Sequence, residues 1–321
     1  MMRRWLWATS CLLSAIPAFA AEARLAFRPA GPGLYEFDTG VLRGQLKLDG
    51  KYQGLYPLVD SVSGADLTRP PGVFSPYRVF STNRRYGDAA RDWPTRTRRL
   101  PEGGVEAFFA ATDEHPLDMT AVYQWVAPDT LDFRVIVEPK QKMPSFELFM
   151  SNYFAQNFRA AVYVQREGRG SAVFAPADKK AGSPRSYVLF PRDAAAVSLV
   201  QDGRWKIPPS PVDWEIERPL AAPLAVRRDA ALGITAVLMS LPQDCFAVAT
   251  PWNPVTPDAK GYRSLYLSLF GRDLESGARA GARCRLLIRR RISDEEAVAR
   301  YEKFRREAYS TLLAPGDPRA K

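Results

Sequence analysis

Residues 74–94 of the chain, FSPYRVFSTNRRYGDAARDWP, concentrate side chains that could recognise an anionic ligand. The stretch contains the arginines Arg78, Arg84, Arg85 and Arg91 and the aromatic residues Phe74, Tyr77, Phe80, Tyr86 and Trp93. A guanidinium group is a planar fork that fits carboxylates, sulfates and pairs of hydroxyl groups. An aromatic ring offers an apolar face against which a sugar ring can lie. Contact with a saccharide, above all an acidic one, is therefore predicted for Arg78, Arg84, Arg85, Tyr86 and Trp93.

A structural role for the same stretch is also open. Asp88 and Asp92 could neutralise the neighbouring arginines within the loop, and the rings could pack the loop onto a sheet. Phe74 to Phe80 is expected to form a strand, and residues 81–93 a long connection over the face of a sheet.

A second group of chemical candidates lies on the strand expected at Phe146–Phe154. Because side chains alternate along a strand, Phe146, Leu148 and Met150 should face the core and Glu147 and Tyr153 should face away from it. On that face Glu147 is the best carboxylate base and Tyr153 a candidate proton shuttle. Asn152 and, in a proline-rich connection, Trp252 are further candidates for substrate contact. An exposed strand face without a ligand remains the alternative.

His115 is the only histidine in the chain, and therefore the only side chain whose ordinary pKa lies near neutrality. Acidic neighbours at Asp113, Glu114 and Asp118 would let it act as a general acid or as one metal ligand. A single histidine does not build a transition-metal site in the usual way, and no calcium-loop spacing of the EF-hand type occurs. We therefore expect no metal and no cofactor, and a solvated loop histidine is the alternative to a catalytic one.

Other reaction classes lack their motifs. The sequence has no G-x-S-x-G nucleophile elbow, no phosphate-binding Walker A loop and no credible G-x-G-x-x-G fingerprint after a strand. Hydrolases of the α/β type and nucleotide chemistry are therefore disfavoured.

The elements that must position these residues are mostly strands. Leu117–Val126 and Leu131–Val137 alternate apolar and polar residues around a four-residue turn, which predicts an antiparallel hairpin. Further strands are expected within 35–48 and at 146–154, 161–164, 196–200, 232–239, 246–250, 265–270 and 282–288. Ser293 and Glu296 match a capping box that starts a C-terminal helix with an apolar stripe. The 27 prolines cluster in connections, because proline is excluded from central strands. The fold class is therefore all-β, a large antiparallel β-sandwich with one C-terminal helix.

Residues 1–20 have the pattern of a signal peptide, with Arg3 and Arg4 before an apolar run and a small-x-small site at Ala18–Ala20. Cleavage after Ala20 would leave residues 21–321 as a single domain, periplasmic or secreted. The net charge of +10 favours acidic partners, and export makes nucleic acid the weakest of them. No later stretch predicts membrane insertion. An oxidising compartment permits a disulfide between Cys245 and Cys284, although free buried thiols are equally open.

Three stretches of the chain resemble the galactose-mutarotase-like superfamily of carbohydrate-active proteins: GVLRGQL at 40–46, YQGLYPLVDSVSGADL at 52–67, and LYLSLFGRDLESGARAGARCRLLI at 265–288. The resemblance implies a β-supersandwich. Aldose epimerases of this type use a histidine with a glutamate as acid and base, whereas this chain has only His115. Mutarotase activity is therefore disfavoured.

Together these observations predict an exported protein that binds or acts on carbohydrate, with cofactor-free acid/base chemistry of the epimerase or lyase type if it is an enzyme. In lyases of acidic polysaccharides a tyrosine or histidine often serves as base while arginine or asparagine neutralises the carboxylate. The rival prediction is a non-catalytic periplasmic binding or structural protein. The oligomeric state is not determined by the sequence.

Overall fold

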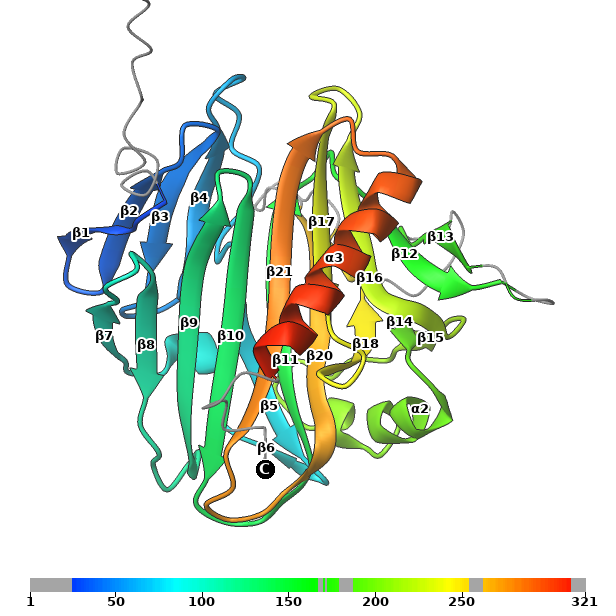
Figure 1. The fold of residues 1–321 in the computed structure, drawn as a ribbon. Helices are drawn as coiled ribbons and strands as arrows, with labels where there is room; N and C mark the ends of the chain where they lie inside the picture. Colours follow the sequence, from blue (N-terminus) through cyan, green and yellow to red (C-terminus); the bar gives the residue numbers. More distant parts are fainter. Residues whose placement is uncertain (1–24, 167–169, 171, 179–186, 254–261, 313–321) are drawn as a thin grey trace, which may run out of the picture.

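The computed structural model describes residues 25–166, 170, 172–178, 187–253 and 262–312. Within them the chain forms three β-sheets, which confirms the all-β sandwich (Figure 1). The predicted signal peptide lies outside the described residues, so export and cleavage remain predictions, as does the single domain at 21–321.

The first large sheet has nine strands in the order β13-β12-β16-β17-β21-β10-β9-β8-β7. They are β7 (Arg96–Arg99), β8 (Val105–Phe109), β9 (Leu117–Ala127), β10 (Thr130–Pro139), β12 (Arg159–Gln165), β13 (Ala172–Pro176), β16 (Leu220–Asp229), β17 (Ile234–Ser240) and β21 (Ala280–Arg290). The predicted hairpin is β9 and β10. Leu117, Met119 and Tyr123 are buried on its inner face, as the alternation required.

The second large sheet contains eight strands and carries most of the candidate residues. Its order is β15-β14-β18-β20-β11-β5-β6, with β19 also paired to β20. The strands are β5 (Ser75–Ser81), β6 (Arg84–Arg85), β11 (Met143–Ala155), β14 (Val188–Pro191), β15 (Glu215–Ile216), β18 (Cys245–Ala249), β19 (Trp252–Asn253) and β20 (Tyr262–Leu274). All described pairs in the sheet are antiparallel except β14 with β15.

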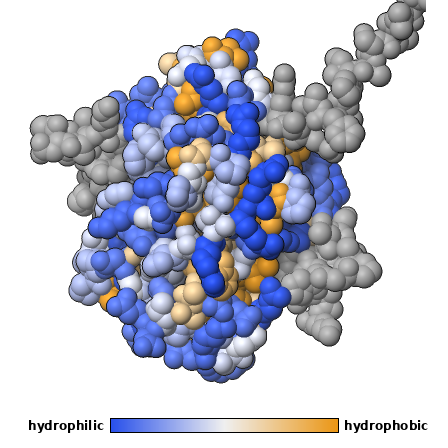
Figure 2. Space-filling view, turned by 90° about the vertical axis from the view of Figure 1, so that its left-hand side faces the viewer, coloured by the Kyte–Doolittle hydropathy of each residue, from blue (hydrophilic) through white to orange (hydrophobic). Residues whose placement is uncertain are grey.

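A third, four-stranded sheet closes one side of the sandwich. It consists of β1 (Arg28–Gly31), β2 (Leu34–Asp38), β3 (Leu42–Lys47) and β4 (Gly54–Asp60). β2 and β3 are the two short strands expected within 35–48. Figure 2 shows this side of the molecule, where hydrophobic residues are scattered among hydrophilic ones. One core cluster, running from Phe27 to Ile288 along the chain, joins side chains of all three sheets.

The C-terminal helix α3 (Asp294–Leu312) lies across the outer face of the nine-stranded sheet (Figure 1). Ser293 Oγ accepts a hydrogen bond from the Glu296 N–H at 3.1 Å, so the predicted cap is present. The buried stripe contains Tyr301, Phe304 and Ala308, which pack on the outward side chains of β16, β17 and β21 in a separate cluster. Within the described residues, no helix combines the length and apolar composition needed to cross a bilayer.

One predicted strand is wrong. Residues 196–200 belong to helix α2 (Ala194–Val200), whose start is capped by the Asp193 carboxylate accepting from the Ala196 N–H at 2.8 Å. The apolar, β-branched residues suggested a strand, but the aspartate cap and the three alanines that follow it favour a helix.

Candidate functional site

Strand β11 places its alternate residues as the sequence predicted. Leu148 and Met150 belong to the main core, whereas Phe149 and Tyr153 belong to a separate cluster on the opposite, outer face of the eight-stranded sheet. Glu147 and Ser151 share the parity of Phe149 and Tyr153. The carboxylate and phenol candidates, Glu147 and Tyr153, therefore both lie on the outer face of β11.

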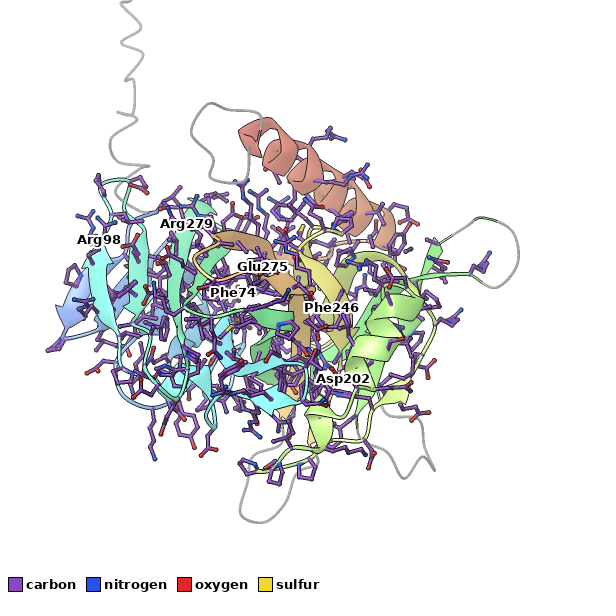
Figure 3. All side chains as sticks on the ribbon, turned by 90° about the horizontal axis from the view of Figure 1, so that it is seen from below. Phe74, Arg98, Asp202, Phe246, Glu275 and Arg279 are labelled. Atoms are coloured by element: carbon purple, nitrogen blue, oxygen red, sulfur yellow. The ribbon has the colours of Figure 1, made fainter. Side chains whose placement is uncertain are left out.

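This outer face is covered by residues 192–216, which carry α2 and the short 3-10 helix η2 (Arg204–Lys206). The rings of Trp205 and Trp214 pack there, with the Trp205 ring centroid 4.6 Å from that of Phe149 and 5.0 Å from that of Trp214. Figure 3, seen from below, shows the segment with α2 and the labelled Asp202 beside this sheet. Residues 192–216 therefore cover part of the outer face of the eight-stranded sheet.

The polar groups of the face meet at the hydroxyl of Tyr153. Tyr153 Oη accepts a hydrogen bond from Tyr266 Oη at 2.7 Å and one from Arg91 Nη1 at 3.4 Å. Arg91 Nη1 also lies 3.5 Å from Ser151 Oγ, and its guanidinium lies 4.2 Å from the ring centre of Tyr77. We call Tyr77, Arg91, Ser151, Tyr153 and Tyr266 the Tyr153 cluster. Its elements are β5, the 3-10 helix η1 (Ala90–Asp92), β11 and β20.

The Tyr153 cluster keeps a limited connection to solvent. Tyr153 is 5% exposed and Arg91 9% exposed, whereas Tyr52, whose ring centre is 5.7 Å from the Arg91 guanidinium, is 55% exposed. Burial acts to lower the pKa of Arg91, but the hydroxyls of Tyr153, Tyr266 and Tyr77 outweigh it and the pKa is raised. Arg91 is therefore a fixed cation beside the Tyr153 oxygen.

Glu147 is also buried on the outer face, in contact with a different arginine. Glu147 Oε2 accepts from Arg204 Nη1 at 3.1 Å, and Arg204 Nη2 contacts Asp202 Oδ2 at 2.8 Å. Burial raises the pKa of Glu147, and Arg204 only partly opposes it because Asp202 shares the same guanidinium. The pKa of Arg204 is raised, since the two carboxylates outweigh its burial. This triad attaches the covering segment to β11, which favours a structural role for Glu147.

Asn152 has the opposite parity to Tyr153, and its side chain is fully buried. Its Oδ1 accepts from the Phe74 N–H at 2.9 Å, and its Nδ2 donates to the Leu265 carbonyl at 2.9 Å. Phe74 has a positive φ of 49°, so the amide supports a turn that the backbone does not adopt easily. The predicted ligand contact by Asn152 stays a prediction, and these bonds favour a structural role.

The arginines of the predicted binding stretch have different surroundings. Arg78 is buried and donates to the Ser210 carbonyl at 2.8 Å, with its guanidinium 5.1 Å from the Trp205 ring centre. Arg85 donates to the carbonyls of Gly87, Asp88 and Pro209. Arg84 is exposed and lies over the ring of Tyr86, whose hydroxyl is 2.8 Å from Ser81 Oγ. Arg78 and Arg85 therefore hold residues 209–210 of the covering segment against β5 and β6.

His115 and Trp93 lie together. Their ring centres are 3.8 Å apart, and His115 Nδ1 is 2.6 Å from Thr112 Oγ1. Trp252 is in β19, paired with Arg263 of β20, but its side chain lies outside the described residues. Among described residues, no group of three or more histidine, cysteine, aspartate or glutamate side chains could hold a metal ion.

Burial lowers the pKa of His115 below its ordinary value of 6.5. Just below that value the unfolded chain binds more protons than the folded chain, so the free energy of unfolding should rise with pH across this window. We expect His115 to make stability fall on acidification from neutrality, and this contribution to be lost in His115→Gln. Glu147, whose pKa is raised by burial, contributes a slope of the opposite sign above its ordinary value of 4.5 in both proteins. Urea unfolding at a series of pH values measures it. The pKa values of Asp60, Asp118 and Asp193 are lowered from 3.8. These carboxylates therefore affect the pH dependence of stability only in the more acidic range. Equal slopes in both proteins near neutrality would refute this assignment.

The two cysteines, for which a disulfide was left open, are free buried thiols. Burial raises the pKa of the Cys245 thiol to about 12, which disfavours a reactive thiolate. Both side chains belong to the main core.

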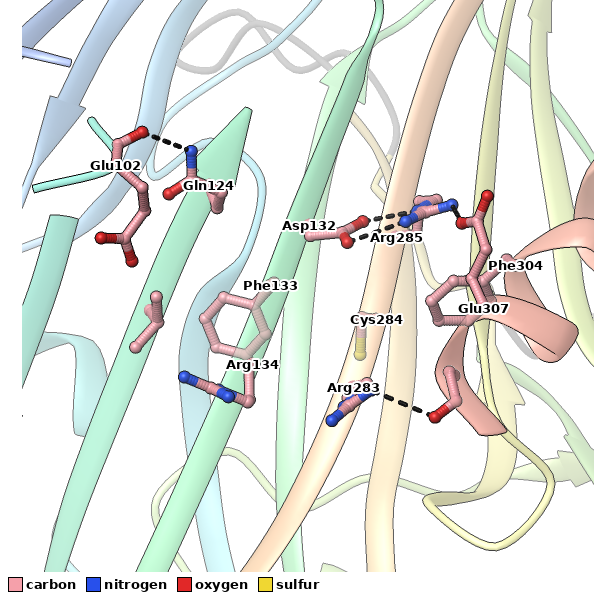
Figure 4. Close-up of a pocket in the computed structure, with 12 residues that line it drawn as sticks. Glu102, Gln124, Asp132, Phe133, Arg134, Arg283, Cys284, Arg285, Phe304 and Glu307 are labelled. Carbon is pink, nitrogen blue, oxygen red and sulfur yellow. Dashed lines mark hydrogen bonds and ion pairs between the residues drawn. The ribbon is translucent and has the colours of Figure 1, made fainter. Parts of the chain in front are cut away.

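A hollow of about 270 Å³ lies on the outer face of the nine-stranded sheet beside α3 (Figure 4). Arg285 Nε contacts Asp132 Oδ1 at 2.5 Å, and Arg285 Nη1 contacts Glu307 Oε2 of the helix at 2.5 Å. These pairs connect α3 to β10 and β21, and we assign them a structural role.

Of the five members of the Tyr153 cluster, only Tyr153 was selected from the sequence. Arg91 and Tyr77 belong to the conspicuous 74–94 stretch but were not chosen over their neighbours. Tyr266 lies on β20, two positions from the partner of Tyr153, because Tyr153 pairs with Ser264 and Ser151 with Tyr266. Only the pairing register of β11 with β20 identifies this neighbour.

No family model and no curated protein matches the chain. Solved structures similar to it include a galactose 1-epimerase from Lactobacillus acidophilus NCFM, with 9% identity, a TM-score of 0.46, and coverage of 83% of this chain and 97% of that one. A GalM/aldose epimerase homologue from C. elegans has 8% identity and a TM-score of 0.46, covering 78% of this chain and 96% of that one. A heparan sulfate lyase mutant from Pedobacter heparinus has 8% identity and a TM-score of 0.48, covering 83% of this chain and 36% of that one.

Aldose epimerases are thus among the similar structures, in agreement with the resemblance seen in the sequence. At these identities and TM-scores the similarities carry no assignment of activity. The chemistry is therefore argued from the residues of this chain.

Proposed function

We propose that this protein binds acidic saccharides at the Tyr153 cluster and acts on them by cofactor-free acid/base chemistry. The observation that carries the proposal is the double hydrogen bond to Tyr153 Oη, from Tyr266 at 2.7 Å and from Arg91 at 3.4 Å. A hydroxyl oxygen that accepts two such bonds, one from a cation, is arranged to bear developing negative charge. With the predicted export, the acidic saccharide would be periplasmic or extracellular.

The reaction that best uses this arrangement is β-elimination from a uronic acid polymer. Tyr153, as its phenolate, would remove the proton on the carbon next to the carboxylate, and the electron pair of that C–H bond would form a carbon–carbon double bond. The bond from the adjacent carbon to the glycosidic oxygen would break, and the Tyr153 hydroxyl would give its proton to that oxygen, which regenerates the phenolate. Arg91 would hold the substrate carboxylate while negative charge builds on it, and the rings of Tyr52 and Tyr77 would flank the sugar.

Binding without turnover is the second candidate, and one observation favours it. Glu147 is engaged with Arg204, and Asn152 with two backbone groups. Of the three residues predicted on this strand, Tyr153 alone has its contacts within the Tyr153 cluster. A single phenol beside an arginine and two rings would also suffice for a binding site.

The test is incubation of the chain with alginate, pectate and glycosaminoglycans while the absorbance of an unsaturated product is recorded. Tyr153→Phe keeps the ring but removes the oxygen, and should lower the rate about 10²–10⁴-fold, the range for losing a general acid or base. Tyr163→Phe is the matched control, because Tyr163 packs against Phe174 in the cluster under α3. Its rate should change less than about twofold.

Each outcome separates the candidates. Saccharide binding that Arg91→Gln weakens, with no unsaturated product from any polymer, would favour the binding protein. Full activity in a folded Tyr153→Phe variant would exclude Tyr153 as the base.

A further inference from the structure

A cavity of about 380 Å³ lies where the chain passes from β11 of the eight-stranded sheet to β12 of the nine-stranded sheet. Its wall contains the turn residues Gln156 and Asn157, the arginines Arg159 and Arg263, and Asp229 at the end of β16. The volume falls within the range of about 300–1,000 Å³ that is usual for small-molecule sites.

Three arginines gather around this cavity. Arg159 is exposed at its edge, and Arg263 is buried in its wall. Arg227 lies behind them, 1% exposed, where its Nη1 donates to the Phe158 carbonyl at 3.2 Å and to Asp178 Oδ1 at 3.1 Å. Its Nη2 donates to the Ser264 carbonyl. The buried guanidinium is thereby fixed in place and adds positive charge behind the wall.

The charges of the three arginines affect one another. Burial lowers the pKa of Arg227 to about 10; Asp178 opposes this, whereas Arg263 and Arg159 lower the pKa further. Burial also lowers the pKa of Arg263, again opposed by Asp178 and reinforced by Arg159. Like charges held close together in a partly dehydrated site repel one another. An anion placed among them would reduce that repulsion.

The carboxylates near the cavity already have partners. Asp178 pairs with Arg227. Asp229 Oδ1 accepts from the Ala231 N–H at 2.9 Å and the Leu232 N–H at 3.0 Å, which fixes the turn between β16 and β17. Asp229 still contributes one negative charge to the wall, against the two positive charges of Arg159 and Arg263. Among the described residues the wall is therefore cationic.

We propose that this cavity is a second ligand site, which binds an oxyanion such as a carboxylate, sulfate or phosphate group. Arg159 and Arg263 supply the charge and a fork of donors, and the side-chain amides of Gln156 and Asn157 can donate to and accept from hydroxyl groups next to the anion. The site is distinct from the Tyr153 cluster. Phe154 pairs with Arg263 and Tyr153 with Ser264, so Arg263 and Tyr153 project from opposite faces of the sheet.

Isothermal titration of the chain with sodium sulfate, sodium glucuronate and neutral glucose tests the proposal. Arg159→Gln should weaken binding of the anions about tenfold or more, the usual scale for losing one charge-assisted hydrogen bond. Arg228→Gln is the matched control, because Arg228 is the register partner of Arg159 but pairs with Asp294 of α3. We expect its affinity to stay within about twofold of the parent chain.

Equal affinity for sulfate and glucuronate would support recognition of the oxyanion alone. Tighter binding of glucuronate would support a saccharide subsite in which the amides contribute. Absence of binding by both anions, equal binding of glucose, or an unchanged affinity in Arg159→Gln would overturn the proposal. Tyr153→Phe should leave the binding of sulfate unchanged, because sulfate is not a substrate of the proposed elimination. The sulfate titration therefore distinguishes failure of this site from failure of the Tyr153 chemistry.

Discussion

Arg204→Met is expected to lower the free energy of unfolding by about 3–5 kcal/mol, the cost of removing one partner from a buried ion pair. Arg204 and Glu147 have fully buried side chains, and the Asp202 side chain is 20% exposed. Without the guanidinium, two carboxylates would remain close together with no cation between them. Urea unfolding followed by tryptophan fluorescence measures the change, because Trp205 directly follows Arg204.

The companion change Glu147→Gln should cost much less. The pKa of Glu147 is raised by burial, and the guanidinium it contacts is shared with Asp202, so an uncharged amide of the same size relieves an excess of negative charge. In the Arg204→Met background, Glu147→Gln should recover part of the lost stability, which a double-mutant cycle would report as a coupling energy. Arg98→Met is the control, because the Arg98 side chain is exposed in its pair with Glu106 and its loss should change stability far less.

Glu147→Gln also distinguishes a structural role of Glu147 from a catalytic one. If Glu147 is only structural, Glu147→Gln should keep whatever activity the parent chain shows. If Glu147 is the catalytic base, the folded variant should lose about 10²–10⁴-fold in rate. A parent-like stability of Arg204→Met would show instead that the triad does not secure the covering segment.

The faces of individual strands could be predicted from the sequence, because alternation is a local property. The assignment of Leu148 and Met150 to the core and of Tyr153 to the outer face needed nothing beyond the period of two. The covering of that outer face could not be predicted in this way. It depends on residues 192–216 returning over β11, which the sequence shows only as a proline-rich region with Trp205 and Trp214.

The composition of the Tyr153 cluster shows the same limit. Arg91 and Tyr153 are 62 positions apart, and Tyr153 and Tyr266 are 113 positions apart. Their meeting depends on the placement of η1 and on the register of β11 with β20, neither of which the sequence pattern encodes. The residue types were informative, since an arginine-rich and tyrosine-rich stretch does supply the cation. The choice among its arginines required the fold.

Asn152→Leu is expected to destabilise the chain by about 1–3 kcal/mol, the cost of leaving a buried polar group without its partner. The change removes the acceptor of the Phe74 N–H and a donor to the Leu265 carbonyl. Phe74 also has a left-handed φ of 49°, so its turn has little other support. The midpoint of urea unfolding should fall while the slope m stays constant, because the surface exposed on unfolding does not change.

Gln45→Ala is the control for this change, because Gln45 makes a surface amide contact with Glu36 and should cost less than about 0.5 kcal/mol. The two roles of Asn152 predict opposite pairs of results. If Asn152 supports the turn, Asn152→Leu lowers the free energy of unfolding. Saccharide affinity, measured at urea concentrations well below the unfolding midpoint, then stays at the parent value. If Asn152 contacts the ligand, Asn152→Leu lowers saccharide affinity and leaves the free energy of unfolding at the parent value. That result would support the predicted contact of Asn152 with the ligand.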